Sequence, residues 1–261
     1  MMIHHEGVPI ESFEAWAQAV AGSTSSRWRP GDPGYDMALA WCPPDRPPGL
    51  PPELRELLHL PGGGDLDDGP EPGRLEVLQV EPVALGRDTP GATLRMELHS
   101  AVGPVAGHVL AWGDAPFGLR VEGELRTAVQ EIARDQDSDR VETIRSLART
   151  LLPPPKPGLE PLEPLDPLGA LRWELLRQVG EARTRALEAG TDRVLFVVHE
   201  IVSLGRTRES RRRNNREDLD RFVRRLSGGA IPRLQRGVVA GPVSLLGGVE
   251  LYLGKARRDL P

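Results

Sequence analysis

The stretch VLFVVHEIVS, residues 194–203, indicates the fold more strongly than any other part of the sequence. Its side chains are almost continuously apolar, which is typical of a strand covered on both faces rather than of a half-exposed strand. We therefore predict a central strand here, in a sheet with helices on either side. Successive side chains of a strand point to opposite faces, so His199 and Glu200 are expected on opposite sides of that sheet, with His199 buried and hydrogen-bonded.

The segments that flank residues 194–203 favour helices and one more strand. Residues 167–189 have the spacing of an amphipathic helix, which Gly190 can end. After the central strand, residues 215–229 favour a second helix that ends at two glycines, and residues 249–254 favour a strand. Alternation of strands with helices of this length is typical of an α/β fold with a mixed sheet.

Between residues 74 and 125 the apolar spacing changes from helical to alternating. Leu94, Met96 and Leu98 alternate with polar side chains, and turns rich in Gly and Pro interrupt the region. This pattern predicts an antiparallel meander of four strands, at about residues 75–85, 92–99, 105–112 and 118–125. A helix is expected over residues 126–152, with a break near 135–138, followed by a proline-rich surface strap over 153–167.

The first 60 residues favour short helices, at residues 11–22, from Pro33 onward and at 51–60. The loop 61–73 is rich in Gly and Asp and is the first candidate boundary. We therefore expect helical N-terminal elements (1–60) packed on an α/β core (74–261), together forming one structural domain.

Composition excludes several classes of protein. The chain has 261 residues, a formal net charge of −5 and one cysteine, Cys42, which excludes a disulfide framework and a cysteine-based zinc cluster. No apolar run approaches about 18 residues and no leader peptide is recognisable, so a cytoplasmic protein without a membrane partner is expected. Of the 33 basic residues all are arginine except Lys156 and Lys255.

A candidate metal site lies in the last predicted strand of the meander. In a strand over residues 118–125, Arg120, Glu122 and Glu124 would share one face. Two carboxylates at this spacing can hold a divalent cation, together with Asp114 or His108 from the neighbouring strand. The alternative is an ordinary charged face in contact with solvent.

Residues 108–125, HVLAWGDAPFGLRVEGEL, resemble the strand–turn–strand of PD-(D/E)XK nucleases. A longer, ordered set of stretches resembles an uncharacterised family of bacterial proteins with that core. The set covers most of residues 27–254 and comprises RWRPGDPGYDMALAW, GLPPELRELL, LRVEGEL, LFVVHEIVS, NREDLDRFVRRL and ELYLG. The resemblance implies a restriction-endonuclease-like fold and a nucleic-acid phosphodiesterase that uses Mg or Mn, in a restriction or defence setting.

The resemblance also implies roles for single residues. Glu122 corresponds to the metal-binding glutamate, whereas Glu124 stands where the family has lysine. His108 stands where the family has aspartate, unless Asp114 takes that place after a shift. The extra helical acid of such nucleases corresponds to Glu53 or Glu56 in the predicted helix 51–60.

These departures have chemical consequences. The lysine of such a site activates the attacking water and offsets charge that develops on the phosphate, which a glutamate at position 124 cannot do. Histidine in place of aspartate favours Mn, Zn or Ni over Mg. The site is therefore either a catalytically degenerate remnant or a rewired metal site built from His108, Glu122 and Glu124.

A cluster of arginines precedes and enters the predicted helix 215–229. Its members are Arg206, Arg208, Arg211, Arg212, Arg213 and Arg216. Guanidinium groups in this arrangement can contact the phosphates of DNA or RNA, although a solvated turn or a protein-contact surface has the same composition. Two functions follow: a metal-dependent nucleic-acid phosphodiesterase or its degenerate relative, and a non-catalytic binding or assembly protein that uses residues 206–216 for a partner.

Overall fold

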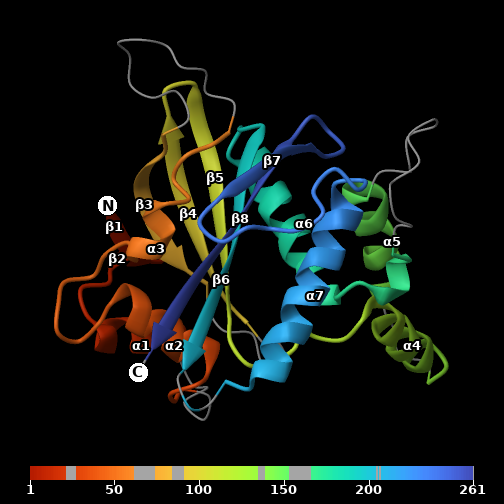
Figure 1. Ribbon diagram of the computed structural model, residues 1–261, viewed down its shortest axis with the longest axis horizontal. Helices are drawn as coiled ribbons and strands as arrows, with labels where there is room; N and C mark the ends of the chain where they lie inside the picture. The colour runs from red at the N-terminus through yellow and green to blue at the C-terminus, as the bar shows by residue number, and fades with distance from the viewer. Residues whose placement is uncertain are drawn as a thin grey trace.

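The computed structural model describes residues 1–21, 28–61, 74–83, 91–134, 139–152, 166–203, 205 and 207–260. It shows an α/β protein with an eight-stranded mixed sheet between two layers of helices (Figure 1). The predicted proline-rich strap lies almost entirely outside the described residues, as does Arg206. Within the described residues, no helix is long and apolar enough to cross a membrane.

The strand order of the sheet is β2-β1-β3-β4-β5-β6-β8-β7. Strands β3, β4 and β5 form an antiparallel meander and correspond to the first three of its four predicted strands, whereas β5, β6 and β8 run parallel to one another. The bounds are β1 (Met2–His5), β2 (Val8–Pro9), β3 (Glu76–Pro82), β4 (Ala92–Ser100), β5 (Gly103–Trp112), β6 (Arg193–Ser203), β7 (Val239–Ser244) and β8 (Glu250–Leu260).

The prediction of a doubly covered central strand is confirmed by β6. It lies between β5 and β8, and its side chains enter two separate apolar cores. Leu195 and Val197 belong to the core on one face of the sheet, whereas Phe196 and Val198 belong to the core on the other. Burial on both faces explains why the sequence of this strand is apolar without alternation.

Three short helices cover the first face: α1 (Phe13–Ala21), α2 (Pro33–Trp41) and α3 (Pro52–Arg55). Trp16 and Trp41 are fully buried in this core, which packs the N-terminal helices on the sheet. The N-terminal segment also contributes β1 and β2, which were not predicted, because strands of four and two residues are too short to show a period.

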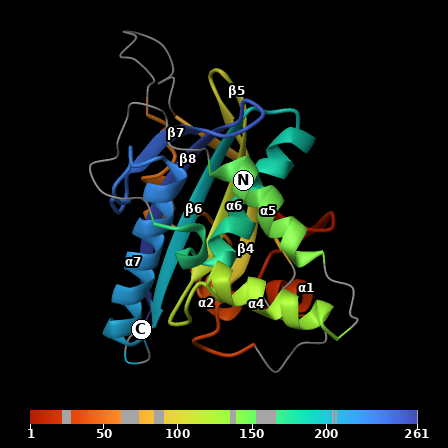
Figure 2. The same ribbon diagram turned by 90° about the vertical axis from the view of Figure 1, so that its right-hand side faces the viewer.

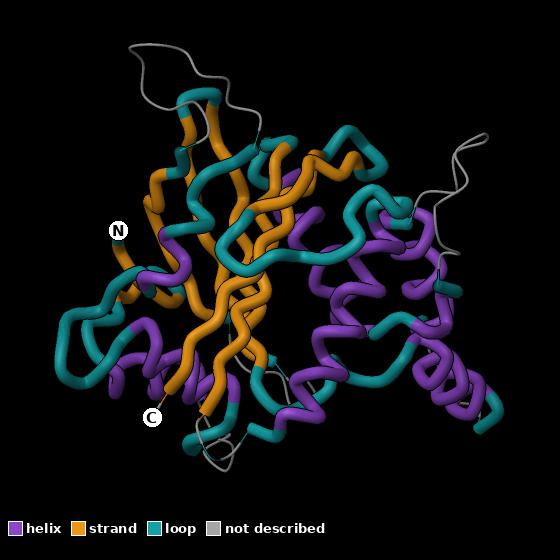
Figure 3. The backbone as a smooth tube through the Cα atoms, in the orientation of Figure 1, coloured by secondary structure: helices purple, strands orange, loops and turns teal. Residues whose placement is uncertain are grey.

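Longer helices lie on the side of the second face, with α4 and α5 packed outside α6: α4 (Val121–Ile132), α5 (Arg140–Leu151), α6 (Trp173–Glu188) and α7 (Glu209–Leu226). A short 3₁₀ helix, Leu168–Ala170, precedes α6. The apolar faces of α6 and α7 pack against the same sheet face as Phe196, and Figures 2 and 3 show both helices lying alongside the strands.

The prediction of a strand over residues 118–125 is wrong. The chain turns at Gly118, whose φ is 66°, and then enters α4. Val121 and Ala128 are buried on one side of this helix, a spacing of two turns, so the helical period describes the segment better than the alternation does. Glu122 and Glu124 lie in the first turn, where the helix dipole favours carboxylates.

Candidate functional site

His108 lies in the middle of β5, within the core, and is 1% exposed. Its Nε2 is 2.6 Å from Oε1 of Gln178 on α6, and its ring stacks on Phe196 with centroids 5.5 Å apart. Burial lowers the pKa of His108 to about 4, so its imidazole is neutral at neutral pH. The contacts of His108 are therefore those of a packed core residue that links the sheet to α6.

The two glutamates of the predicted metal site bind arginines instead. Oε1 of Glu122 is 3.0 Å from Nη2 of Arg126 on the helix surface, and Oε2 of Glu124 is 3.0 Å from Nη1 of Arg140 on α5. Figure 1 places α4 on the outside of the helical layer, away from β5. The structure thus does not bring His108 together with these carboxylates, because they belong to a helix and not to a neighbouring strand.

These residues do not fit the Mg or Mn ion that the resemblance implies. A shared ion needs its ligands within about 2.0–2.6 Å of one point, whereas His108 and the two glutamates each have a separate protein partner. Among the described residues, no group of three or more His, Cys, Asp and Glu side chains is placed to hold a metal ion.

Asp114, the fourth candidate of the predicted catalytic set, holds the start of α7. Its Oδ1 accepts the backbone N–H of Arg208 at 3.0 Å, and its Oδ2 lies 3.5 Å from Nη1 of Arg211. This carboxylate satisfies a backbone donor that a helix start leaves without an intrahelical partner, and it neutralises one arginine of the cluster. Asp114 therefore anchors α7 to the end of β5.

His199 has the buried, hydrogen-bonded environment that the sequence predicts. Its Nε2 donates to Oε1 of Glu53 on α3 at 2.9 Å, and Arg258 of β8 places Nη1 3.2 Å from Oε2 of the same carboxylate. Burial raises the pKa of Glu53. The hydrogen bond from His199 and the nearby positive charges together lower that pKa by more than burial raises it, so the net shift is downward. Glu53, a candidate for the extra helical acid, thus ties α3 to the sheet.

Glu200 faces the opposite side of the sheet and belongs to a different cluster. Its Oε1 is 3.4 Å from Nε of Arg212 on α7, and Nη1 of Arg212 is 2.7 Å from Oε2 of Glu209. Arg212 is only 12% exposed. One member of the arginine cluster is therefore turned inward and joins α7 to the central strand.

Lys255, on β8, completes this cluster and was missed by the sequence analysis. It pairs with Val198 in the sheet register and points to the same face as Glu200, where it is 9% exposed. Burial lowers the pKa of Lys255, and Arg216 and Arg212 add to that effect, although Glu200 and Asp220 oppose it. A lysine next to an apolar strand, in a chain whose basic residues are otherwise almost all arginine, could have identified this position.

A small cavity opens between α7 and the carboxyl-terminal parts of β5 and β6, where ligands commonly bind in sheets with parallel strands. Its volume is about 20 Å³, enough for a water molecule or one small polar group. Asn215 donates from Nδ2 to the Ala115 carbonyl at 2.9 Å and so fixes α7 to the turn after β5. The lining consists of Trp112, Gly113, Phe117, Val198, Glu200, Asn215, Arg216, Leu219 and Lys255.

The described arginines of the cluster lie at the N-cap and in the first two turns of α7, which begins six residues before the predicted helix 215–229. Arg212 and Arg216 are one helical turn apart and both lie near Lys255. Four arginines of the cluster are exposed, namely Arg208, Arg211, Arg213 and Arg216. We call these four, together with Arg212 and Lys255, the α7 cation surface.

Comparisons with known proteins give no indication of the function of this chain. No protein-family model matches the sequence, and no curated protein and no solved structure is significantly similar to the chain.

Proposed function

We propose that this protein binds a nucleic acid through the α7 cation surface, without metal-dependent cleavage at His108, Glu122 and Glu124. One observation carries this proposal: the positive charges of α7 are concentrated at one end of the helix. Residues 208–216 have five arginines and one glutamate, whereas residues 217–226 have three arginines and three acidic residues. In a chain with a net charge of −5, this end of α7 is a local cation surface suited to phosphates.

The small cavity beside Lys255 supports recognition of a phosphate backbone rather than of bases. It admits one polar group, such as a phosphate oxygen, and not a nucleotide base. The aromatic side chains that line it, Trp112 and Phe117, are each 2% exposed and pack against each other with tilted rings. They therefore offer no free ring face for base stacking, and we expect binding with little sequence preference.

A restriction-endonuclease-like fold of the chain is part of the same proposal. A mixed sheet with helices on both faces supports a restriction-endonuclease-like core. The strand–turn–strand at residues 108–125, which carried the resemblance to the nuclease motif, is a strand followed by a helix. We therefore favour the non-catalytic alternative of the two functions, with the α7 cation surface as the element that binds the partner.

Fluorescence anisotropy with short labelled duplex and single-stranded DNA and RNA tests the proposal. The triple variant Arg211→Gln, Arg213→Gln, Arg216→Gln should bind at least about tenfold more weakly than the native chain. Its log–log salt slope for duplex DNA should fall by roughly 0.9 for each phosphate that the variant no longer neutralises. The matched control is the double variant Arg126→Gln, Arg145→Gln, which removes exposed arginines from α4 and α5.

Unchanged binding by the triple variant, or equal weakening by the control, would contradict the proposal. Absence of nucleic-acid binding in the native chain would also overturn it and leave the protein-partner alternative. A plasmid-nicking assay with Mn and EDTA tests cleavage separately: nicking that is lost in Glu122→Ala would restore the metal site.

A further inference from the structure

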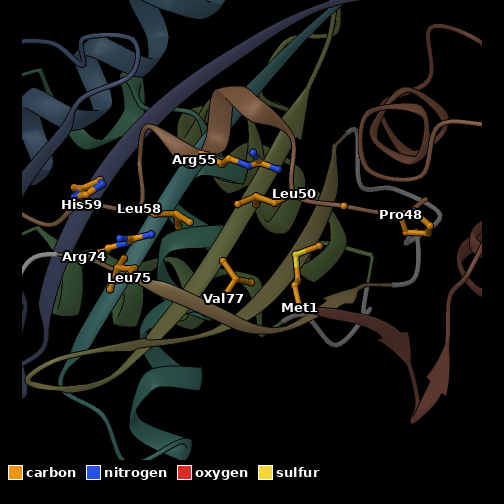
Figure 4. Close-up of a pocket in the computed structure, with 10 residues that line it drawn as sticks. Met1, Pro48, Leu50, Arg55, Leu58, His59, Arg74, Leu75 and Val77 are labelled. Atoms are coloured by element: carbon orange, nitrogen blue, oxygen red, sulfur yellow. The ribbon is translucent and has the colours of Figure 1, made fainter. Parts of the chain in front are cut away.

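A second and larger cavity lies on the other face of the sheet. Its volume is about 770 Å³, and it lies between the segment 48–59, which includes α3, and the start of β3, with Met1 at its edge (Figure 4). This size falls within the range of about 300–1,000 Å³ that is usual for small-molecule sites. We call it the α3 pocket, and it shares no lining residue with the cavity beside Lys255.

The floor of the α3 pocket is apolar, and backbone bonds join its walls. Leu75 and Val77 are 3% and 9% exposed, and Leu50 and Leu58 are half-buried beside them. The N–H of Leu75 donates to the Leu58 carbonyl at 2.8 Å, and the next pair along the two segments forms an antiparallel bridge. The two walls are therefore held together by the main chain, so the pocket is formed before any ligand enters.

The rim of the α3 pocket is basic. Arg55, His59 and Arg74 line it, and none of the ten described residues that line the pocket is acidic. Figure 4 shows Arg55 beside Leu50, and Arg74 with His59 at the opposite end near Leu58. Arg55 and Arg74 are exposed, and neither guanidinium makes an ion pair or a hydrogen bond with another described residue.

We infer that the α3 pocket binds an apolar carboxylate of the size of a medium-chain fatty acid. The apolar chain covers the leucines of the floor, and the carboxylate accepts a forked pair of hydrogen bonds from Arg55 or Arg74. Among the described residues of this rim a cation meets only like charge, and a neutral chain leaves both guanidinium groups without a counterion. Charge complementarity in an otherwise acidic protein therefore selects an anionic head group on an apolar body.

Isothermal titration calorimetry of the full chain tests this inference with three ligands of equal chain length. Decanoate should bind at least about tenfold more tightly than decanol, and decyltrimethylammonium should bind more weakly still. In the double variant Arg55→Gln, Arg74→Gln, the preference for decanoate over decanol should disappear while the affinity for decanol stays. The double variant Arg126→Gln, Arg145→Gln, which removes exposed arginines from α4 and α5, is the matched control and should leave the affinities for all three ligands unchanged.

The inference is overturned if decanoate does not bind, or if the three ligands bind equally. It is also overturned if the double variant keeps the preference for decanoate, because the rim arginines would then not bind the carboxylate head group. If an acidic, apolar peptide binds with dependence on Arg55 and Arg74 while decanoate does not, the pocket exists but the assigned ligand class is wrong. None of these results bears on nucleic-acid binding by α7, so the two proposals fail independently.

Discussion

Neighbouring residues of β6 lead into two unlike polar clusters, one on each face of the sheet. His199 is 0% exposed and binds the Glu53 carboxylate, which also pairs with Arg258. Among the described residues, Nδ1 of His199 and Nε of Arg258 have no hydrogen-bond partner. On the other face, Glu200 shares its surroundings with three cations, Arg212, Arg216 and Lys255. We call the first cluster the closed side, and we call the second the open side, because it lies at a cavity and mixes these cations with the acids Glu200, Glu209 and Asp220.

This difference separates a structural cluster from a binding site. Buried polar groups that are paired with one another stabilise the fold and leave little for a ligand to bind. A buried lysine beside two arginines is held at the expense of stability, and groups of that kind gather at functional sites. The comparison therefore predicts opposite consequences for substitutions on the two faces.

The largest effect is expected on the closed side, for Glu53→Ala. Removing this carboxylate leaves the buried His199 and the partly buried Arg258 without their partner, which should lower the free energy of unfolding by about 2–3 kcal/mol. Urea denaturation followed by circular dichroism measures the loss. The control is Glu56→Ala, one turn along and exposed, which should change stability by less than about 0.5 kcal/mol. Equal losses in the two variants would show that the cluster does not stabilise the fold.

The pH dependence of this cluster sharpens the comparison. The folded-state pKa of Glu53 lies below its ordinary value of 4.5, so its contribution to stability is present above about pH 4.5. That contribution is lost as the pH falls through the folded-state pKa, because the unfolded chain binds the proton first. The difference in stability between the native chain and Glu53→Gln should therefore shrink in acid, as measured by urea unfolding from neutral pH downward. A difference that grows in acid would contradict the assigned shift.

On the open side, Lys255→Met should change the free energy of unfolding by no more than about 1 kcal/mol, and in either direction. Replacing a desolvated charge by an apolar side chain of similar length is often neutral or stabilising. The same variant should bind nucleic acid more weakly in the anisotropy assay. A loss of stability as large as that of Glu53→Ala would mean that the α7 side is a balanced cluster too, and would break the comparison.

The smallest effect is expected outside both clusters, at Glu122→Ala. The ion pair of Glu122 with Arg126 is exposed on both sides, with side chains 70% and 71% accessible. Exposed pairs one turn apart on a helix contribute about 0.3–0.5 kcal/mol. Chemical denaturation should therefore show almost no change, and nucleic-acid binding should be unaffected. Loss of a metal-dependent activity in this variant would instead return Glu122 to the candidate site.

Much of the fold could be predicted from the sequence because periodic burial is a local property. The apolar run of β6, the alternation in β4 and the helical spacing of α6 each reflect how the side chains of one segment meet one core. Residues 118–125 were predicted to form a strand because the few alternating positions there fit a strand as well as the start of a helix. Contacts with a distant segment fix where the helix begins, since the N–H of Val121 donates to the Leu171 carbonyl at 2.8 Å.

The sequence by itself determined the doubly covered strand β6, the alternating strand β4 and the helix α6. It also determined that His199 and Glu200 point to opposite faces, since a strand has a period of two. Only the tertiary structure decided which charged groups meet. Glu53 and His199 are 146 residues apart, and Lys255 reaches Glu200 only because β8 lies beside β6. The same placement separates His108 from Glu122 and Glu124, because the connection from β5 to β6 includes the helix α4, which carries both glutamates. Strand order and crossover connections bring remote positions together, and no local spacing of residues encodes them.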